Sequence, residues 1–406
     1  MAQTKTPYGL VYNDDGSLCV TYRDDDVPFQ GVRSFAVETA TTNLVNVYTL
    51  HANSGVNTVS TIERIDTPFG MKDVVKIMKT GTGSLFRRKN LYSPVSGEAV
   101  AITLFVKPIN GLSQIIIAQN FGPIKSYTFS TGDGYIKYGW HKITHKFVSG
   151  NVNSIDLWLD KYDYSEEGNQ GCYVISQVES GKRYCTSYVD ESRPKAEWYI
   201  EASDIEAEEN RLKNHVISFW FKVQESYDEE YNTLQDYSNW MIVGTRRGGM
   251  WDVPTGWQLG VLNSTNAFIN GFESVGRLIF VFRDEVNPFP VLLAEKGTFE
   301  NKWNHIIITK VEANDTEEMK VYLNGKLKVT RIAGNCASRY SGVVENLLFC
   351  NDTNTPYYTQ RSHLISNLYI GKYKRDDGTV IWTNDYIREV YENQIPFTNP
   401  PAISIY

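Results

Sequence analysis

Residues 319–330 read Met-Lys-Val-Tyr-Leu-Asn-Gly-Lys-Leu-Lys-Val-Thr, and this stretch decides the class of fold. Apolar and polar side chains alternate on both sides of Asn324-Gly325, which is the pattern of half-buried strands. Asn-Gly supplies the two left-handed residues that a tight hairpin turn requires. The stretch therefore predicts two antiparallel strands joined at residues 324–325.

Similar apolar runs extend in both directions from this hairpin, separated by turn residues. They form two groups, residues 73–78, 99–106, 113–118, 140–147, 154–159 and 171–178, and residues 215–223, 239–244, 257–261, 277–282, 303–310 and 366–371. Regularly spaced short strands are typical of sandwiches and jelly rolls. Residues 384–392 alone show helical spacing, with Ile387, Val390 and Tyr391 on one face.

Length and composition predict more than one domain. The chain has 406 residues, of which 41% are hydrophobic and 13% aromatic, enough for two cores of strand-forming residues. We expect an all-β protein with two antiparallel β-sandwich (jelly-roll) domains, an extended N-terminal arm and a short C-terminal helix. The expected divisions are an arm at 1–46, a sandwich at 47–193, an acidic linker at 194–213, a sandwich at 214–394 and an extended tail at 395–406.

Charge and hydropathy exclude several function classes. The net charge is -7 and the basic residues are scattered, which argues against nucleic-acid binding. No apolar run is long enough to cross a bilayer, so we expect no membrane insertion. The first residues, Met-Ala-Gln-Thr-Lys-Thr-Pro, lack the apolar region of a signal peptide, which predicts a soluble protein that is not exported by that route.

The five cysteines define neither a disulfide framework nor a zinc site, because they are odd in number and lack Cys-x-x-Cys spacing. We expect free thiols, mostly buried. Cys172 with Cys185, or Cys336 with Cys350, could still pair if strands bring them together.

The second group of strands resembles the laminin-G-like, concanavalin-A-like sandwiches. The resemblance rests on Ser-Phe-Trp-Phe at 218–221, Trp-Asn-His at 303–305, Tyr-Leu-Asn-Gly at 322–325 and Leu-Tyr-Ile-Gly at 368–371, in that order. It covers roughly residues 210–395 and implies a surface-binding sandwich.

The first group is similar to carbohydrate-binding-module-like jelly rolls of phage structural proteins. The residues that carry this resemblance are Gln-Val-Glu at 177–179 and Thr-Ser-Tyr at 186–188, together with Ala-Val-Glu-Thr-Ala-Thr-Thr-Asn-Leu at 36–44, which resembles a segment of many tail and fibre proteins. The resemblance implies a phage tail or fibre protein, assembled into the virion in the host cytoplasm. It would act as a homo-oligomeric adhesin that binds a host-surface glycan or protein and docks on other virion proteins through its arm. The alternative is a purely structural head-fibre or tail-collar protein without glycan binding.

Catalytic motifs are missing from the sequence. Glucanases of the concanavalin-A type use Glu-x-Asp-x-x-Glu on one strand face, yet no Glu here is followed two positions later by Asp. Gly-x-Ser-x-Gly, the phosphate loop and the dinucleotide fingerprint are absent as well. We therefore expect a protein that is not an enzyme; a depolymerase is the less favoured reading.

Metal and cofactor sites are not indicated. His141 and His145 share a spacing that could bind a metal, but they lack a third ligand, and we interpret them as ordinary strand residues. Acidic turns at 24–26, 284–285 and 376–378 could ligate calcium, although they form no recognisable loop. The prediction is no metal site and no cofactor.

One loop-rich stretch is the candidate ligand-binding surface, because sugars are commonly bound by aromatic rings beside polar groups. Its residues are Tyr237, Trp240, Arg246, Arg247 and Trp251. Three other tryptophans lie inside apolar runs and are predicted to belong to the core, namely Trp220, Trp257 and Trp303.

Overall fold

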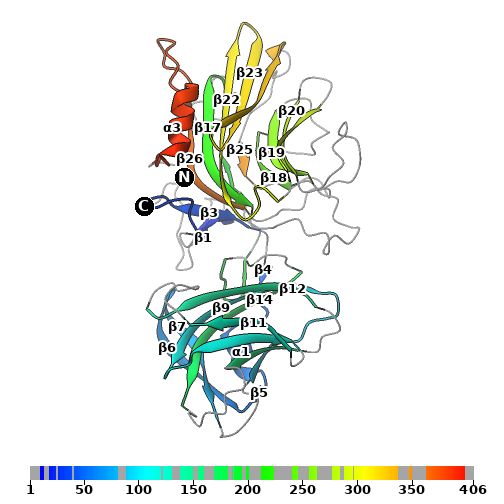
Figure 1. Cartoon of the computed structure of the whole chain (residues 1–406), viewed down its shortest axis with the longest axis vertical. Coiled ribbons are helices and arrows are strands. Elements are labelled where there is room, and N and C mark those ends of the chain that lie inside the picture. The colour runs from blue at the N-terminus through cyan, green and yellow to red at the C-terminus, as the bar shows by residue number, and fades with distance from the viewer. Residues whose placement is uncertain are drawn as a thin grey trace. The chain divides into compact units, whose positions relative to one another are not determined.

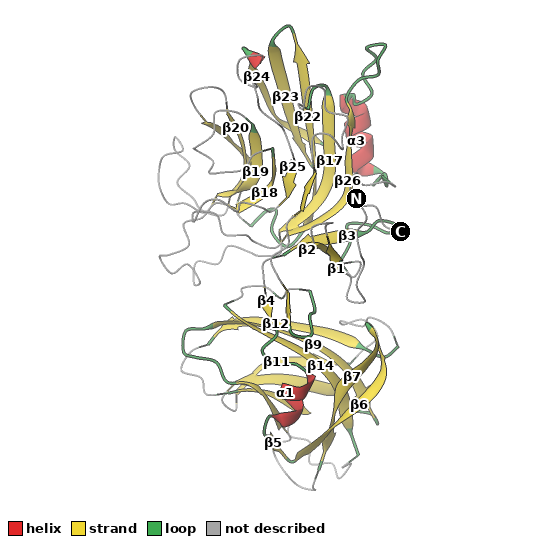
Figure 2. Ribbon diagram, turned by 180° about the vertical axis from the view of Figure 1, so that it is seen from behind, coloured by secondary structure: helices red, strands yellow, loops and turns green. Residues whose placement is uncertain are grey.

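The computed structural model describes residues 10–12, 18–23, 26–38, 41–80, 88–119, 122–129, 138–149, 154–159, 169–181, 185, 187–193, 198–200, 212–223, 240–245, 256–262, 277–283, 288–295, 297–336, 347–349 and 363–397. These residues form antiparallel sheets, to which two helices are added (Figures 1 and 2). The predicted all-β class is confirmed. No helix within these ranges has the length and apolar content needed to span a membrane.

The chain divides into two compact units. The inserted unit is continuous in sequence, Ala40–Arg193, whereas the terminal unit combines Met1–Thr39 with Pro194–Tyr406. The N-terminal and C-terminal segments therefore form one unit together, and the sequence of the other unit is inserted between these two segments.

The inserted unit contains two five-stranded sheets with orders β12-β9-β14-β7-β6 and β11-β10-β13-β8-β5, and a two-stranded ladder of β4 and β15. Its strands are β4 (Thr41–Thr42), β5 (Gly55–Val56), β6 (Thr58–Thr67), β7 (Gly70–Lys79), β8 (Arg88–Tyr92), β9 (Ala99–Ile109), β10 (Gln114–Gln119), β11 (Gly122–Thr128), β12 (His141–Val148), β13 (Ile155–Leu159), β14 (Gly171–Ser180) and β15 (Ser192–Arg193).

Alternation along each strand builds the core between the two sheets. In β9 the side chains of Val100, Ile102 and Leu104 face that core, where they meet Ile115 and Ile117 of β10. Helix α1 (Val47–Ala52) lies beside the sheets. It begins at Asn46, whose side chain accepts hydrogen bonds from the backbone N–H groups of Tyr48 and Thr49 at 3.1 and 3.0 Å.

The terminal unit is a sandwich of an eight-stranded sheet, β1-β2-β3-β26-β17-β22-β23-β24, and a six-stranded sheet, β16-β25-β18-β19-β20-β21. Its strands are β1 (Leu10–Tyr12), β2 (Leu18–Tyr22), β3 (Ser34–Val37), β16 (Trp198–Ile200), β17 (His215–Val223), β18 (Trp240–Gly244), β19 (Trp257–Leu262), β20 (Arg277–Arg283), β21 (Pro288–Ala294), β22 (Trp303–Ala313), β23 (Thr316–Leu323), β24 (Lys326–Ala333), β25 (Leu347–Phe349) and β26 (His363–Lys372). Buried apolar side chains of both sheets form one core.

The hairpin predicted at residues 324–325 joins β23 to β24. Asn324 and Gly325 have φ angles of 51° and 73°, and Leu323 pairs with Lys326 across the turn. The Asn324 Oδ1 atom also accepts a hydrogen bond from the backbone N–H of His305 at 2.8 Å. The turn is thus fixed both by its own backbone and by the neighbouring strand.

Helix α3 (Asn384–Glu392) confirms the predicted C-terminal helix. Ile387 and Val390 are buried against Val216, Ile307 and Tyr322 of the eight-stranded sheet. In Figure 1 the red helix runs along the outer side of β26 and β17. A helix of this length is marginal alone, so packing against the sheet stabilises it.

The N-terminal segment differs from a free arm at 1–46. Strand β3 pairs with β26, from Ser34 opposite Ser366 to Val37 opposite His363, and β2 and β1 extend the sheet beyond it. Figure 1 shows the blue β3 beside the orange β26. The segment has too few apolar residues for a core of its own. It needs no separate core, because its strands extend the edge of the eight-stranded sheet.

Two further divisions also differ from expectation. Within the predicted linker 194–213, Trp198 is buried and stacks on Phe349 at 4.4 Å between ring centroids, because β16 pairs with β25. Within the predicted tail, Phe397 packs on Tyr369 at 4.7 Å, and its backbone N–H donates to Asn367 Oδ1 at 2.6 Å. Residues 398–406 lie outside the described residues.

Candidate functional site

The predicted aromatic and arginine surface falls largely outside the part of the chain that the structure describes. Trp240 opens strand β18, but its side chain is not among those described. Tyr237, Arg246, Arg247 and Trp251 lie outside the described residues. This candidate ligand site therefore stays a prediction.

The predicted core tryptophans divide into two kinds. Trp220 and Trp257 are buried, as predicted. Trp303 is only half-buried, and its Nε1 donates a hydrogen bond to Asp26 Oδ1 at 2.9 Å. Asp26 also accepts a hydrogen bond from Lys222 Nζ at 2.7 Å, so both of its carboxylate oxygens contact protein groups.

Among the described histidines, His305 has a structural environment. His305 is buried beside the rings of Trp220 and Tyr391, at 5.0 and 6.0 Å between centroids, and these two rings lie 5.7 Å from each other. Its imidazole hydrogen-bonds to Ser218 Oγ at 2.9 Å. Burial lowers the pKa of His305 to about 3. His141 and His145 both lie in β12. No group of three His, Cys, Asp or Glu side chains suited to a metal occurs among the described residues.

Of the two cysteine pairs considered above, only Cys172 and Cys185 are both described by the structure, and they form no disulfide. Cys172 and Cys185 are separate thiols, and burial raises the pKa of Cys185 to about 11. Cys350 lies outside the described residues, so its pairing with Cys336 stays untested.

The strongest described site is the outer face of the β12-β9-β14-β7-β6 sheet in the inserted unit. Neighbouring residues in a strand point to opposite sides, so Val75 and Ile77 of β7 enter the core while Lys72, Val74 and Lys76 point outward. We call this second side the outer face.

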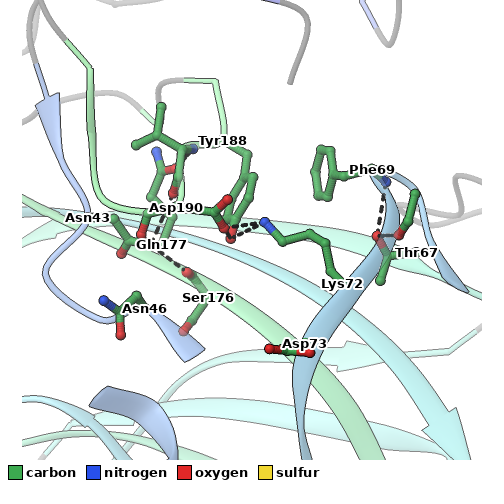
Figure 3. Close-up of polar contacts among 12 residues, drawn as sticks. Asn43, Asn46, Thr67, Phe69, Lys72, Asp73, Ser176, Gln177, Tyr188 and Asp190 are labelled. Atoms are coloured by element: carbon green, nitrogen blue, oxygen red, sulfur yellow. Dashed lines mark hydrogen bonds and ion pairs between the residues drawn. The ribbon is translucent and has the colours of Figure 1, made fainter. Parts of the chain in front are cut away.

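A first cluster on the outer face consists of Lys72, Tyr188 and Asp190 (Figure 3). Lys72 Nζ forms an ion pair with Asp190 Oδ1 and lies 3.3 Å from Tyr188 Oη. Tyr188 Oη donates to the same carboxylate at 2.7 Å, and the ammonium lies 4.7 Å from the centre of the tyrosine ring. Two different donors therefore fix one carboxylate.

Aromatic rings support this first cluster. Phe69, from the turn between β6 and β7, stacks on Tyr188 at 4.7 Å between centroids and meets Phe105 edge-on at 4.8 Å. Trp140 is fully buried in the same group, and its Nε1 donates to the carbonyl of Asp66 at 3.4 Å. The outer face thus has its own small apolar layer, which limits the mobility of the tyrosine.

A second cluster, made of Glu63, Lys76 and Tyr173, lies on the same face. Lys76 Nζ donates to Glu63 Oε1 at 3.0 Å, and Tyr173 Oη donates to Glu63 Oε2 at 2.9 Å. Tyr173 is directly opposite Lys76 in the ladder of β14 and β7. The ammonium lies 5.8 Å from the centre of the tyrosine ring.

Long-range hydrogen bonds position the residues that no strand carries. Tyr188 and Asp190 belong to an irregular segment beside β14. Gln177 of β14 holds this segment, because its Oε1 accepts a hydrogen bond from the backbone N–H of Val189 at 2.7 Å. Asn43 Nδ2 donates to the carbonyl of Val189 at 3.2 Å. Figure 3 shows Asn43, Gln177 and Tyr188 together beside the end of Lys72.

Electrostatics differ between the clusters because their exposure differs. The Lys72 side chain is 12% exposed, and burial lowers its pKa despite the nearby Asp190. The hydrogen bond from Lys76 lowers the pKa of Glu63, and the reverse interaction raises the pKa of Lys76. Burial, followed by the bond to Glu63, raises the pKa of Tyr173. Each cluster thus combines a lysine, a carboxyl group and a phenol.

Such an arrangement is suited to binding hydroxylated molecules. Ionised carboxylates only accept hydrogen bonds, ammonium groups only donate, and a phenol does both. Asp190, Glu63 and Lys76 are 38%, 36% and 28% exposed, so their remaining bonding capacity is accessible.

Sequence reasoning did not select these residues. Tyr173 and Tyr188 were part of the stretch that carried the jelly-roll resemblance, but nothing local marked them as surface residues. The alternation Lys72, Val74, Lys76 in β7 is the one local signal that could have indicated a polar outer face.

Comparisons with known proteins identify no family for the chain. No protein family matches the sequence, and no curated protein does so either. Solved structures similar to parts of the chain include a sialidase carbohydrate-binding module from Ruminococcus gnavus bound to α2,3-sialyllactose. It has 14% identity and a TM-score of 0.29, over 48% of this chain and 92% of that one.

Two further likenesses cover more of the chain. A putative carbohydrate-binding protein from Bacteroides ovatus has 11% identity and a TM-score of 0.28, over 82% of this chain and 79% of that one. A tail fibre protein of an Escherichia coli phage has 9% identity and a TM-score of 0.22, over 91% of this chain and 47% of that one. These TM-scores are too low for the likenesses to indicate the function of this chain.

Proposed function

We propose that this chain is a non-enzymatic phage virion protein, of the tail or fibre, which binds host-surface glycans during attachment. The observation that supports it is the pair of Tyr–carboxylate–Lys clusters on the outer face of the inserted unit. They offer hydrogen-bond donors, hydrogen-bond acceptors and aromatic rings held by a sheet.

Attachment through such a surface benefits from repetition. A single polar cluster on an open sheet gives weak affinity, whereas several linked copies raise the overall affinity without new contacts. We therefore include a homo-oligomer in the proposal. Contact with other virion proteins would be made by the folded terminal unit, since residues 10–12, 18–22 and 34–37 already belong to its sheet.

The test uses the full chain and a double variant, Glu63→Gln with Asp190→Asn, which removes one carboxylate from each cluster. Both proteins are applied to an immobilised panel of bacterial surface polysaccharides. We expect the variant to lose at least about tenfold in affinity, because each lost charge-assisted hydrogen bond contributes on the order of 1.5–3 kcal/mol.

Asp73→Asn is the matched control. Asp73 lies on the same strand and pairs with Arg64 at 3.3 Å, but its side chain points to the opposite face from Lys72. Equal binding by wild type and double variant would contradict the proposed site. Binding to no polysaccharide would favour the purely structural head-fibre or tail-collar protein, and release of reducing ends would show turnover.

A further inference from the structure

The two clusters on the outer face repeat the same chemistry. In each, one lysine ammonium contacts one carboxylate, and one tyrosine hydroxyl donates to that carboxylate. The ammonium also lies against the ring of the same tyrosine in both. Apart from the two lysines, which share β7, their residues come from different parts of the chain, so the correspondence is a feature of the folded surface.

Strand geometry sets the distance between the clusters. Lys72 and Lys76 are four residues apart on β7 and point to the same side. At about 3.3 Å per residue, their backbones are about 13 Å apart. This backbone spacing is longer than one pyranose ring, which favours an oligomer as the ligand that contacts both clusters.

Charge indicates the class of oligomer. Each cluster pairs one lysine with one carboxyl group. The strand register places three further lysines on the same face outside the clusters, namely Lys107, Lys142 and Lys146. Lys107 is opposite Tyr173 in the ladder of β14 and β9, and it belongs to neither cluster. Hydroxyl groups, which can both donate and accept, match these balanced clusters better than anions do.

We infer that the outer face binds a linear, uncharged oligosaccharide that contacts both Tyr–carboxylate–Lys clusters at once. This inference rests on the proposed function and specifies its ligand. A repeating polymer presents the same hydroxyl groups at regular intervals, and two like clusters on one strand fit such a ligand. Binding at the second cluster then becomes intramolecular once the first is occupied.

The experiment begins with native gel electrophoresis of the full chain through gels that contain mannan, dextran or hydroxyethyl cellulose as uncharged polymers, or alginate as an acidic one. Linear oligomers of the retarding polymer, from monosaccharide to about six units, are then titrated calorimetrically. We expect affinity to rise at least about tenfold between the shortest and the longest oligomers.

Single variants test the role of each cluster. Glu63→Gln or Asp190→Asn should reduce affinity for the longest oligomer at least about tenfold, yet leave monosaccharide affinity within about twofold, because the other cluster is intact. Asp73→Asn and Lys107→Ala should bind like wild type. Unchanged melting temperatures exclude unfolding as the cause of any loss.

Several results would overturn the inference while leaving the proposed function standing. They are retardation by alginate alone, affinity that does not depend on oligomer length, and a loss at only one of the two clusters. A loss in Lys107→Ala larger than that in Glu63→Gln would likewise point to an acidic ligand. Retardation by none of the polymers, together with no binding to the polysaccharide panel, would instead remove the proposed function itself.

Discussion

At the residue scale, His305 shows how a polar side chain can serve structure alone. Its ring lies against both Trp220 and Tyr391 of helix α3, which also contact each other, and one ring nitrogen is hydrogen-bonded to Ser218. Burial disfavours the charged imidazolium, which is why its pKa falls to about 3. The imidazole is therefore part of the packed core.

The low pKa of His305 predicts a pH dependence of stability. The pKa of His305 is 6.5 in the unfolded chain and about 3 in the folded chain. Between these two pH values the unfolded chain binds a proton at this residue and the folded chain does not. Stability of the terminal unit should therefore decrease as the pH falls through this window, by up to about 1.4 kcal/mol per pH unit. Above pH 6.5 the residue contributes no pH dependence.

Urea unfolding at about pH 7 and about pH 4.5, on either side of the unfolded pKa, measures this effect. The difference between the two free energies of unfolding should be smaller in His305→Gln than in wild type. His51→Gln, at an exposed position, is the control and should behave like wild type. An equal pH dependence in all three proteins would show that the histidine is not protonated selectively on unfolding.

At the scale of elements, helix α3 depends on the sheet beneath it. Its cap is local, since Thr383 Oγ1 accepts from the backbone N–H of Tyr386 at 3.2 Å. Its stability comes from Ile387 and Val390, which are fully buried. The spacing of these residues was visible in the sequence, but the strands that receive them were not.

Ile387→Ala should destabilise the terminal unit by roughly 2–5 kcal/mol, because it leaves a cavity between helix and sheet. Intrinsic tryptophan fluorescence, to which Trp382 of the same cluster contributes, would follow unfolding in urea. Glu389→Ala, on the exposed side of the helix, should stay within about 0.5 kcal/mol of wild type. Similar stabilities for the two variants would mean that α3 is not held by this contact.

At the scale of the whole molecule, the terminal unit is built from both ends of the chain. Ser366 Oγ donates to the carbonyl of Arg33 at 2.7 Å, across 333 positions in sequence. Phe35 is buried and lies 5.9 Å from Trp198 between ring centroids. A fragment that starts at the second group of strands would therefore lack part of its sheet.

Deletion of residues 1–39 tests this arrangement. It should expose the edge of β26, destabilise the terminal unit and promote association through the open edge. Hydrogen exchange should show loss of protection in β26 and β17 but retained protection in β9 of the inserted unit, which serves as the internal control. Unchanged protection of β26 would show that β3 contributes little.

The class of fold, the hairpin at Asn324-Gly325 and helix α3 could all be predicted from the amino-acid sequence. Each of these depends on residues close together in the chain, where alternation, turn preference and helical spacing act directly. The pairing of β3 with β26 could not be predicted, because alternation of apolar and polar side chains indicates a strand but not the strand with which it pairs. The same holds for the outer face, since Glu63, Lys76 and Tyr173 meet only after β6, β7 and β14 are aligned. Tyr188 and Asp190 require in addition the hydrogen bonds of Gln177 and Asn43, which no local pattern specifies.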